Sequence, residues 1–290
     1  EVYNASEGEI KDADIEYSII DNDTHSNIIA KYNTTIKYGK NNEIRPITLP
    51  LNGIKAPSKL TLNVSVNGNT NEWDFWVYPS KVEMPKTKDI YITDTLDSKA
   101  IKILNNGGKV LITAGGKIRY GNDVKQTYLP VFWNTSWFKM RPPHTTGAYI
   151  MSNHPIFKDF ATDSWQNINW WELINKAQVM NLQEFPEEYQ PIYQPIDTWH
   201  VSRKLGMIIE ANVLKGKLLM TTFDINSNLN KRIVARQLRK SILEYMSGDS
   251  FKPEITLDIK VIHDLFEKEA TKVNMFTKDS PDELKPKIIR

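Results

Sequence analysis

Over the first 79 residues, apolar side chains alternate with polar ones in short runs separated by turn residues. Leu60, Leu62, Val64 and Val66 share one face of the clearest run. A period of two predicts strands with one buried face, and short turn-bounded runs favour antiparallel pairing. About six strands in roughly 80 residues are typical of an immunoglobulin-like β-sandwich. The runs expected as strands are 15–19, 28–36, 44–51 (broken by two prolines), 60–66 and 73–78.

The pattern changes after Pro79. Apolar runs too continuous for one-sided strands alternate with helical periodicity, which predicts an α/β layer fold with a buried parallel sheet. A hairpin turn is expected at Lys215 and Gly216, and a helix that ends before Gly248. The strands expected here are 90–92, 110–113, 206–213 and 217–224, and the main helices are 97–105 and 234–245.

These patterns predict two domains joined by a short linker. Residues 1–79 form the sandwich, residues 80–88 the linker and residues 89–250 the α/β domain. Residues 251–290 are expected to be a polar C-terminal tail with one short amphipathic helix that presents Ile259, Ile262 and Leu265. The chain begins at Glu-Val-Tyr-Asn without an initiator Met, so we expect a segment of a longer polypeptide.

The composition of the chain limits the classes of binding partner that are expected. The formal net charge is only +2, which gives no field that would attract nucleic acid. No apolar run approaches the roughly 18 to 20 residues that span a bilayer, so membrane insertion is not expected. The first ten residues have neither the basic nor the apolar region of an export signal.

The chain contains no cysteine, which excludes thiol nucleophiles, cysteine-ligated zinc and disulfides. No Gly-x-Ser-x-Gly elbow occurs, and Thr113 alone offers a hydroxyl at the turn after its strand. The glycine pair at 115–116 matches no nucleotide-binding loop. His144, His154 and His200 lack metal-ligand spacing. The sequence therefore predicts no catalytic residue, no metal and no cofactor.

Aromatic residues supply the first candidate site. Six of the eight tryptophans lie between positions 133 and 199. Tryptophan faces pack against pyranose rings while the indole N–H remains free to donate a hydrogen bond, although a single tryptophan is most often part of the core. The candidate sugar-binding residues are Trp133, Trp137, Trp165 and Trp199.

Polar residues supply the second candidate site. Asp197, His200 and Arg203 form the densest polar group, and Asp224 ends a predicted buried strand. Ligands collect beyond the carboxyl ends of parallel strands, so these side chains are ligand-binding candidates; an Asp there also caps turns. Glycoside hydrolysis needs two carboxylates about 5 to 10 Å apart, and no local arrangement selects a pair from Glu172, Glu210 and Asp224.

The predicted β-sandwich closes with the seam Asn71-Glu-Trp-Asp-Phe-Trp-Val-Tyr-Pro79. This seam is similar to the end of a late β-sandwich in bacterial, Bacteroidetes-type proteins of glycoside hydrolase family 2, the β-galactosidase kind, and several later segments resemble the C-terminal region of those proteins. The α/β part resembles a flavodoxin-like or class I amidotransferase-like fold without its cysteine. The other similar segments are 129–137, His154-Pro155, 170–173, 196–200, Leu205-Gly206, 216–219 and 235–239.

The resemblance implies a non-catalytic role, because the catalytic barrel with its two glutamates comes earlier in those proteins. The expected partners are the remaining N-terminal domains of the glycosidase, and oligosaccharide. The implied location is periplasmic or extracellular, with the export signal in the preceding part. Two alternatives remain open: a stand-alone carbohydrate-binding module using the region 133–199, and a hydrolase of unrecognised type using Asp197, His200 and Asp224.

Overall fold

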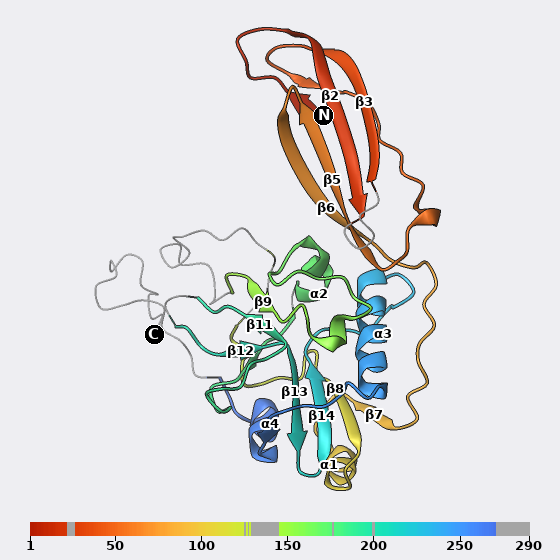
Figure 1. Cartoon of the computed structure of the whole chain (residues 1–290). Helices are drawn as coiled ribbons and strands as arrows, with labels where there is room; N and C mark the ends of the chain where they lie inside the picture. Colours follow the sequence, from red (N-terminus) through yellow and green to blue (C-terminus); the bar gives the residue numbers. More distant parts are fainter. Residues whose placement is uncertain are drawn as a thin grey trace, which may run out of the picture. The chain divides into compact units, whose positions relative to one another are not determined.

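The computed structural model describes residues 1–21, 27–124, 126, 128, 145–175, 177–198 and 201–270. The chain divides into two compact units, Glu1–Lys81 and Val82–Arg290. The first is an antiparallel β-sheet region, and the second is a mixed α/β region with four α-helices among the described residues (Figure 1). Each unit is described by itself.

The first unit contains a four-stranded antiparallel sheet with the order β3-β2-β5-β6. Four of the expected runs are confirmed as strands or parts of strands: β2 (Ile10–Asp21), β3 (Asn27–Ile36), β5 (Ser58–Val66) and β6 (Asn69–Val77). The register places Leu62 opposite both Ile19 and Trp73, so the apolar positions share one face of the sheet. Two short strands, β1 (Val2–Tyr3) and β4 (Asn41–Asn42), form a separate pair.

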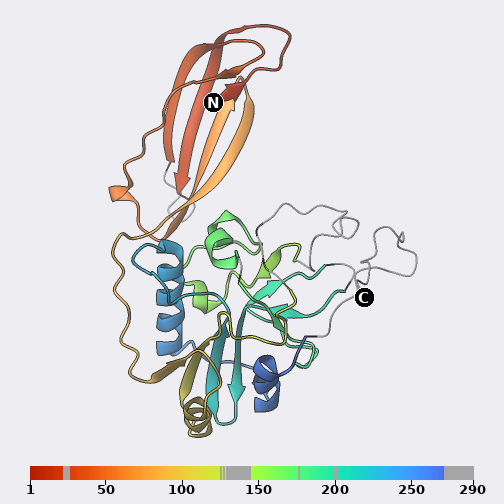
Figure 2. The same ribbon diagram turned by 180° about the vertical axis from the view of Figure 1, so that it is seen from behind.

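The strand expected at 44–51 is wrong. Pro46 and Pro50 remove two backbone N–H donors from this run, so it cannot form a regular ladder. Instead Ile47 and Leu49 pack on the buried cluster of Ile19, Leu60 and Val77. Figure 2 shows the segment running along the sheet as an irregular chain that includes only the 3-10 helix η1 (Leu51–Gly53).

The second unit contains a seven-stranded sheet with the order β7-β8-β14-β13-β11-β9, in which β15 also pairs with β13. The expected parallel sheet is only partly present: β7, β8 and β14 are parallel, as are β13 and β15, whereas the pairs β14–β13, β13–β11 and β11–β9 are antiparallel. The bounds are β7 (Ile90–Thr93), β8 (Lys109–Thr113), β9 (Ala148–Ile150), β11 (Tyr193–Pro195), β13 (Ile208–Val213), β14 (Gly216–Thr221) and β15 (Thr256–Leu257).

The hairpin between β13 and β14 explains the mixed sheet. Val213 pairs with Gly216, which leaves a two-residue turn with Leu214 at a φ of 56°. A tight turn can join only antiparallel strands, so the turn that the sequence predicts reverses the chain direction at this point. A small additional pair is formed by β10 (Met180–Asn181) and β12 (Leu205–Gly206).

The helices end where the sequence signals predict. Asp97 caps α1 (Ser98–Asn105), and Gly248 follows α3 (Ile233–Ser247). Leu104 of α1 and Ile262 of α4 (Ile259–Glu267) share one core cluster with the sheet. The shorter elements are α2 (Trp171–Ile174), η2 (Pro155–Phe157) and η3 (Ile168–Trp170).

Part of the expected C-terminal tail belongs to the α/β core. Strand β15 pairs in parallel with β13, and Leu257, Leu265 and Phe266 are buried in the core cluster. The sequence pattern identified the amphipathic helix correctly, but the two-residue strand before it is too short to give a periodic signal.

Candidate functional site

Strands β8 and β14 are parallel neighbours, so their carboxyl ends lie at the same edge of the sheet. The sequence predicts a ligand-binding role for Asp224 at this edge. The side-chain amide of Asn226, which follows β14, donates a hydrogen bond of 2.8 Å to the hydroxyl of Thr113 at the end of β8. This bond joins the two strand ends. The Thr113 hydroxyl in turn donates to the carbonyl of Thr93 at 3.2 Å. Asp224 therefore lies beside a polar strand edge.

The carboxylate of Asp224 is bonded to residues that follow it closely in the sequence. Its Oδ1 accepts hydrogen bonds from the backbone N–H groups of Asn226 and Ser227, and its Oδ2 lies 2.9 Å from Nη1 of Arg232. Burial raises its pKa, but these hydrogen bonds and the arginine outweigh that effect, so the pKa of Asp224 is lowered. Arg232 also pairs with Glu172. The geometry is that of a turn cap held by an ion pair.

Asp197 and Arg203 are joined to each other in the interior. Nε of Arg203 donates to Oδ2 of Asp197 at 2.8 Å, and Nη1 donates to Asp123 at 2.6 Å. The side chains of Asp197 and Arg203 are only 1% and 5% exposed. No hydrogen bond or ion pair joins Asp197 to Asp224 within the described ranges, and His200 lies outside them.

The tryptophans take different positions. Trp170 is fully buried and packs against Tyr193 and Phe223, as expected for a core aromatic. Trp165 is 60% exposed, and its ring contacts the 40% exposed Tyr149 edge to face, with centroids 5.6 Å apart. This pair is the aromatic platform, an exposed face of the kind that binds sugar rings. The candidates Trp133, Trp137 and Trp199 lie outside the described residues.

Sequence reasoning missed a third location, around Glu210 of β13. Glu210 alternates along the strand with Ile209 and Ala211, so its side chain points away from their core cluster. It meets the hydroxyl of Tyr245 from α3 at 2.7 Å and Nε2 of His154 at 3.6 Å. A charged residue inside a buried strand run was the available signal, but its partners come from distant segments.

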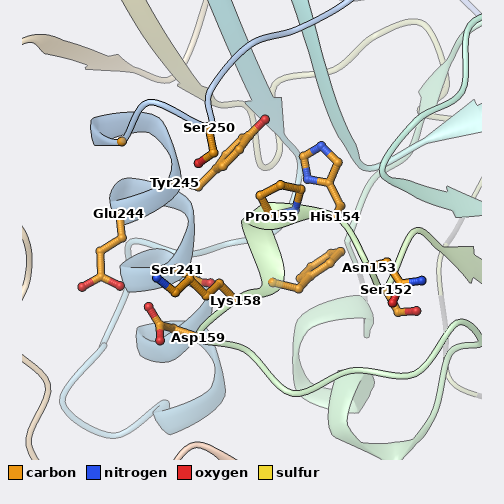
Figure 3. Close-up of a pocket in the computed structure, with 12 residues that line it drawn as sticks. Ser152, Asn153, His154, Pro155, Lys158, Asp159, Ser241, Glu244, Tyr245 and Ser250 are labelled. Carbon is orange, nitrogen blue, oxygen red and sulfur yellow. The ribbon is translucent and has the colours of Figure 1, made fainter.

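Figure 3 shows the cavity beside this group, with His154 and Pro155 facing Tyr245 of α3. The rings of His154 and Tyr245 contact each other edge to face, with centroids 5.1 Å apart. Burial and the neighbouring Glu210 carboxylate raise the pKa of the Tyr245 hydroxyl well above its usual range. The hydroxyl therefore keeps its proton and donates a hydrogen bond to Glu210.

Two family models match the sequence. One, a domain of unknown function named DUF8487, matches residues 91–267, more than half of the chain. The chain belongs to the DUF8487 family. A second domain of unknown function, DUF8488, matches residues 1–79. No curated protein matches the sequence significantly.

The DUF8487 region contains a carboxyl pair at the other end of the same cavity. The carboxyls of Asp159 and Glu244 are neighbours, and Nζ of Lys240 lies 2.6 Å from Glu244 and 3.6 Å from Asp159. The neighbouring Glu244 carboxyl, as a donor to Asp159, lowers the pKa of Asp159. Burial, together with the carboxylate of Asp159, raises the pKa of Glu244. Of the two carboxyls, Glu244 is therefore the one that takes up a proton first as the pH falls.

The described part of the DUF8487 protein contains no group of three or more His, Asp or Glu side chains placed to hold a metal ion. Within the same residues, no helix has the length and apolar character needed to cross a bilayer. The described residues present an exposed aromatic surface at Trp165 and a cavity wall with fixed donors and acceptors at His154 and Glu210.

Proposed function

We propose that this chain is a non-catalytic C-terminal portion of a family 2 type β-glycosidase, where it packs on or assists the catalytic barrel in carbohydrate degradation. On this proposal the first unit is an immunoglobulin-like β-sandwich, and the second is an amidotransferase-like α/β domain without the catalytic cysteine. The partners are the preceding domains of the same polypeptide, and the location is periplasmic or extracellular. The segments similar to those glycosidases support this assignment.

The observation that carries the packing role is an apolar groove on the first unit. The irregular segment 44–51 packs on the apolar face of the sheet and leaves a hollow of about 260 Å³ there. Tyr17, Tyr32, Val64 and Trp73 are among the residues that line it. Trp73 remains 51% exposed although it lies opposite Leu62 on this face. A large exposed aromatic beside an apolar hollow is typical of a surface that another domain covers.

The non-catalytic role is supported by the state of the candidate carboxylates. Asp197 and Asp224 are both paired with arginines, and Asp197 is buried as well. A nucleophile or a general base needs a free lone pair within reach of substrate. These two carboxylates instead hold loops in place.

The packing role is tested by oxidative labelling of tryptophans, measured by mass spectrometry. The isolated chain and the native polypeptide isolated from its source organism are compared. We expect Trp73 to be oxidised readily in the isolated chain and to be protected in the native polypeptide. Trp170 is the internal control, because it is fully buried and should remain unreactive in both. Equal oxidation of Trp73 in the two samples would contradict the proposal.

The aromatic platform favours a second function, which is carbohydrate binding by the chain itself. Tyr149 lies on β9, and a single antiparallel backbone bridge joins Tyr149 to Trp165, so the backbone holds the two rings beside each other. A fixed pair of exposed rings presents an apolar surface without an entropic penalty for ordering loops. The axial C–H groups of a pyranose pack on such a surface.

The test is titration of the chain with lactose, cellobiose and xylobiose, followed by intrinsic fluorescence and calorimetry. We expect Trp165→Ala and Tyr149→Ala to weaken binding by about tenfold or more, which is roughly 1.4 kcal/mol. Trp171→Ala is the matched control, because Trp171 is 49% exposed and shares no ring contact with Tyr149 within the described residues. Equal binding by Trp165→Ala and the wild type would refute the platform.

A further inference from the structure

A second binding site can be argued around His154, independently of the aromatic platform. Two cavities, of about 640 and 420 Å³, share His154, Pro155, Tyr245 and Ser250 in their walls. Both volumes fall in the range of small-molecule sites. Neither Tyr149 nor Trp165 lines these cavities.

The backbone fixes the proton on the His154 ring. Nδ1 accepts a hydrogen bond from the N–H of Ile156 at 3.3 Å, where His154 caps the short helix η2. A neutral imidazole that accepts at Nδ1 carries its proton at Nε2. The free N–H of His154 is therefore directed toward Glu210, but the 3.6 Å separation is too long for a good hydrogen bond.

Glu210 is held with one oxygen still available. Its Oε2 accepts from the Tyr245 hydroxyl at 2.7 Å, and the hydroxyl of Tyr189 bonds to both the backbone N–H and the carbonyl of Glu210. Oε1 faces His154 and accepts no hydrogen bond from the described residues. The wall of the smaller cavity thus presents one donor and one acceptor, 3.6 Å apart, on two side chains that are each 14% exposed.

We infer that His154 and Glu210 form a binding site for a neutral polyhydroxylated ligand, a sugar ring in the context of the proposed function. A hydroxyl group both donates and accepts, so one or two adjacent hydroxyls satisfy the Nε2–H of His154 and the Oε1 of Glu210 together. The ring of Tyr245 and the face of Pro155 supply apolar surface beside them. This inference rests on the carbohydrate-binding function and assigns it a second site.

The carboxylates of the smaller cavity argue against an anionic ligand, and the N–H donor of His154 argues against a cation. A cation would meet the N–H of His154 pointing at it, and an anion would meet the carboxylate of Glu210. Glu188 and Glu254 in the smaller cavity add further repulsion for an anion, with Lys252 as the opposing charge. A neutral hydroxylated ligand avoids both penalties.

Two conservative variants test the site. His154→Asn retains a side-chain oxygen that can accept from Ile156 N–H, because Asn is a favoured helix cap. It removes the ring N–H that is directed toward Glu210, and the NH₂ group that it introduces lies on a shorter side chain. Glu210→Gln keeps an oxygen for the Tyr245 hydroxyl and replaces the free acceptor with an NH₂ donor. Thermal unfolding of both variants should match the wild type closely, which shows that the fold is retained.

The readout is the histidine ring signals in NMR spectra of the Trp165→Ala chain, titrated with galactose, glucose, lactose and cellobiose in turn. We expect at least one sugar to shift the His154 signal saturably. In the same background, Glu210→Gln and His154→Asn should weaken binding of that sugar at least tenfold. An unshifted His154 signal, together with wild-type binding that depends on Trp165, would overturn this inference and leave the platform standing. If none of the four sugars binds to the wild type or to any variant, both proposed sites are overturned.

Discussion

At the scale of single residues, Asp97 shows how one side chain joins a strand to a helix. Its Oδ1 accepts from the backbone N–H of Ala100 at 2.7 Å, which caps α1. Its Oδ2 accepts from the hydroxyls of Tyr91 at 2.9 Å and Thr93 at 3.0 Å, both on β7. Three hydrogen bonds on one carboxylate make Asp97 a sensitive reporter of the fold.

We expect Asp97→Ala to lower the free energy of unfolding of the α/β unit by about 1 to 2 kcal/mol, the usual range for a lost cap. Asp97→Asn is the matched control, because Asn also caps helices well and should lose less stability. Urea unfolding followed by circular dichroism measures both. Equal stability of Asp97→Ala and the wild type would show that the cap contributes nothing.

The same residue predicts a pH dependence. Burial raises the pKa of Asp97, but the hydrogen bonds from Ala100, Tyr91 and Thr93 outweigh burial and lower it. A carboxyl whose pKa is lower in the folded state stabilises the fold above its unfolded pKa of about 4, and this stabilisation is lost as the pH falls through the folded pKa. The stability difference between the wild type and Asp97→Asn should therefore shrink between about pH 5 and pH 2. A difference that stays constant over this range would contradict the assignment.

Residue roles could be predicted from the sequence only in part. The strand that was expected to end at Asp224 is present but ends at Thr221, so Asp224 lies in the turn that follows β14. The exposure of Trp165 and the burial of Trp170 could not be separated, since both stand in one aromatic segment. His154, Glu210 and Tyr245 come from a loop, a strand and a helix, and no local pattern predicts that they meet.

At the scale of elements, periodicity predicted the four strands of the sheet in the first unit, four strands of the sheet in the second unit and all three longer helices, but it did not predict β9 and β11. Periodicity failed where contacts with distant segments, and not the local pattern, determine whether a strand forms. Examples are the proline-broken run 44–51 and the two-residue strand β15. The direction of β13 depends on a single hairpin, so the expectation of a parallel sheet was wrong beyond β14. Strand order requires knowledge of contacts between distant segments.

Gly216 tests how tightly the elements pack where that hairpin begins β14. A Cβ at this position would lie 2.5 Å from the carbonyl oxygen of Gly108 and 2.8 Å from Cα of Leu104. Both are backbone atoms and cannot move aside. We expect Gly216→Ala to lower the free energy of unfolding by about 1 to 3 kcal/mol. Gly248→Ala is the control in the same unit, because its nearest atom lies 3.4 Å away, and unfolding midpoints measure both. Equal midpoints for the two variants would refute the close approach.

At the scale of the whole molecule, the chain is an antiparallel β-sheet unit and a DUF8487 α/β unit, each with its own buried clusters. Among the described residues, the apolar groove beside Trp73 and the aromatic platform at Trp165 both expose large aromatic side chains. Both are binding surfaces in the account proposed for this protein. The central claim is that the chain acts as part of a larger glycosidase.

The most direct measurement is immunoprecipitation from the source organism with antibodies raised against this chain. Polypeptide size and the hydrolysis of nitrophenyl β-glycosides are then measured on the precipitate. We expect a polypeptide much larger than the 33.5 kDa of the chain. The precipitate should carry β-glycosidase activity, and the purified chain alone should have none. A polypeptide of 33.5 kDa with no associated glycosidase activity would contradict the account.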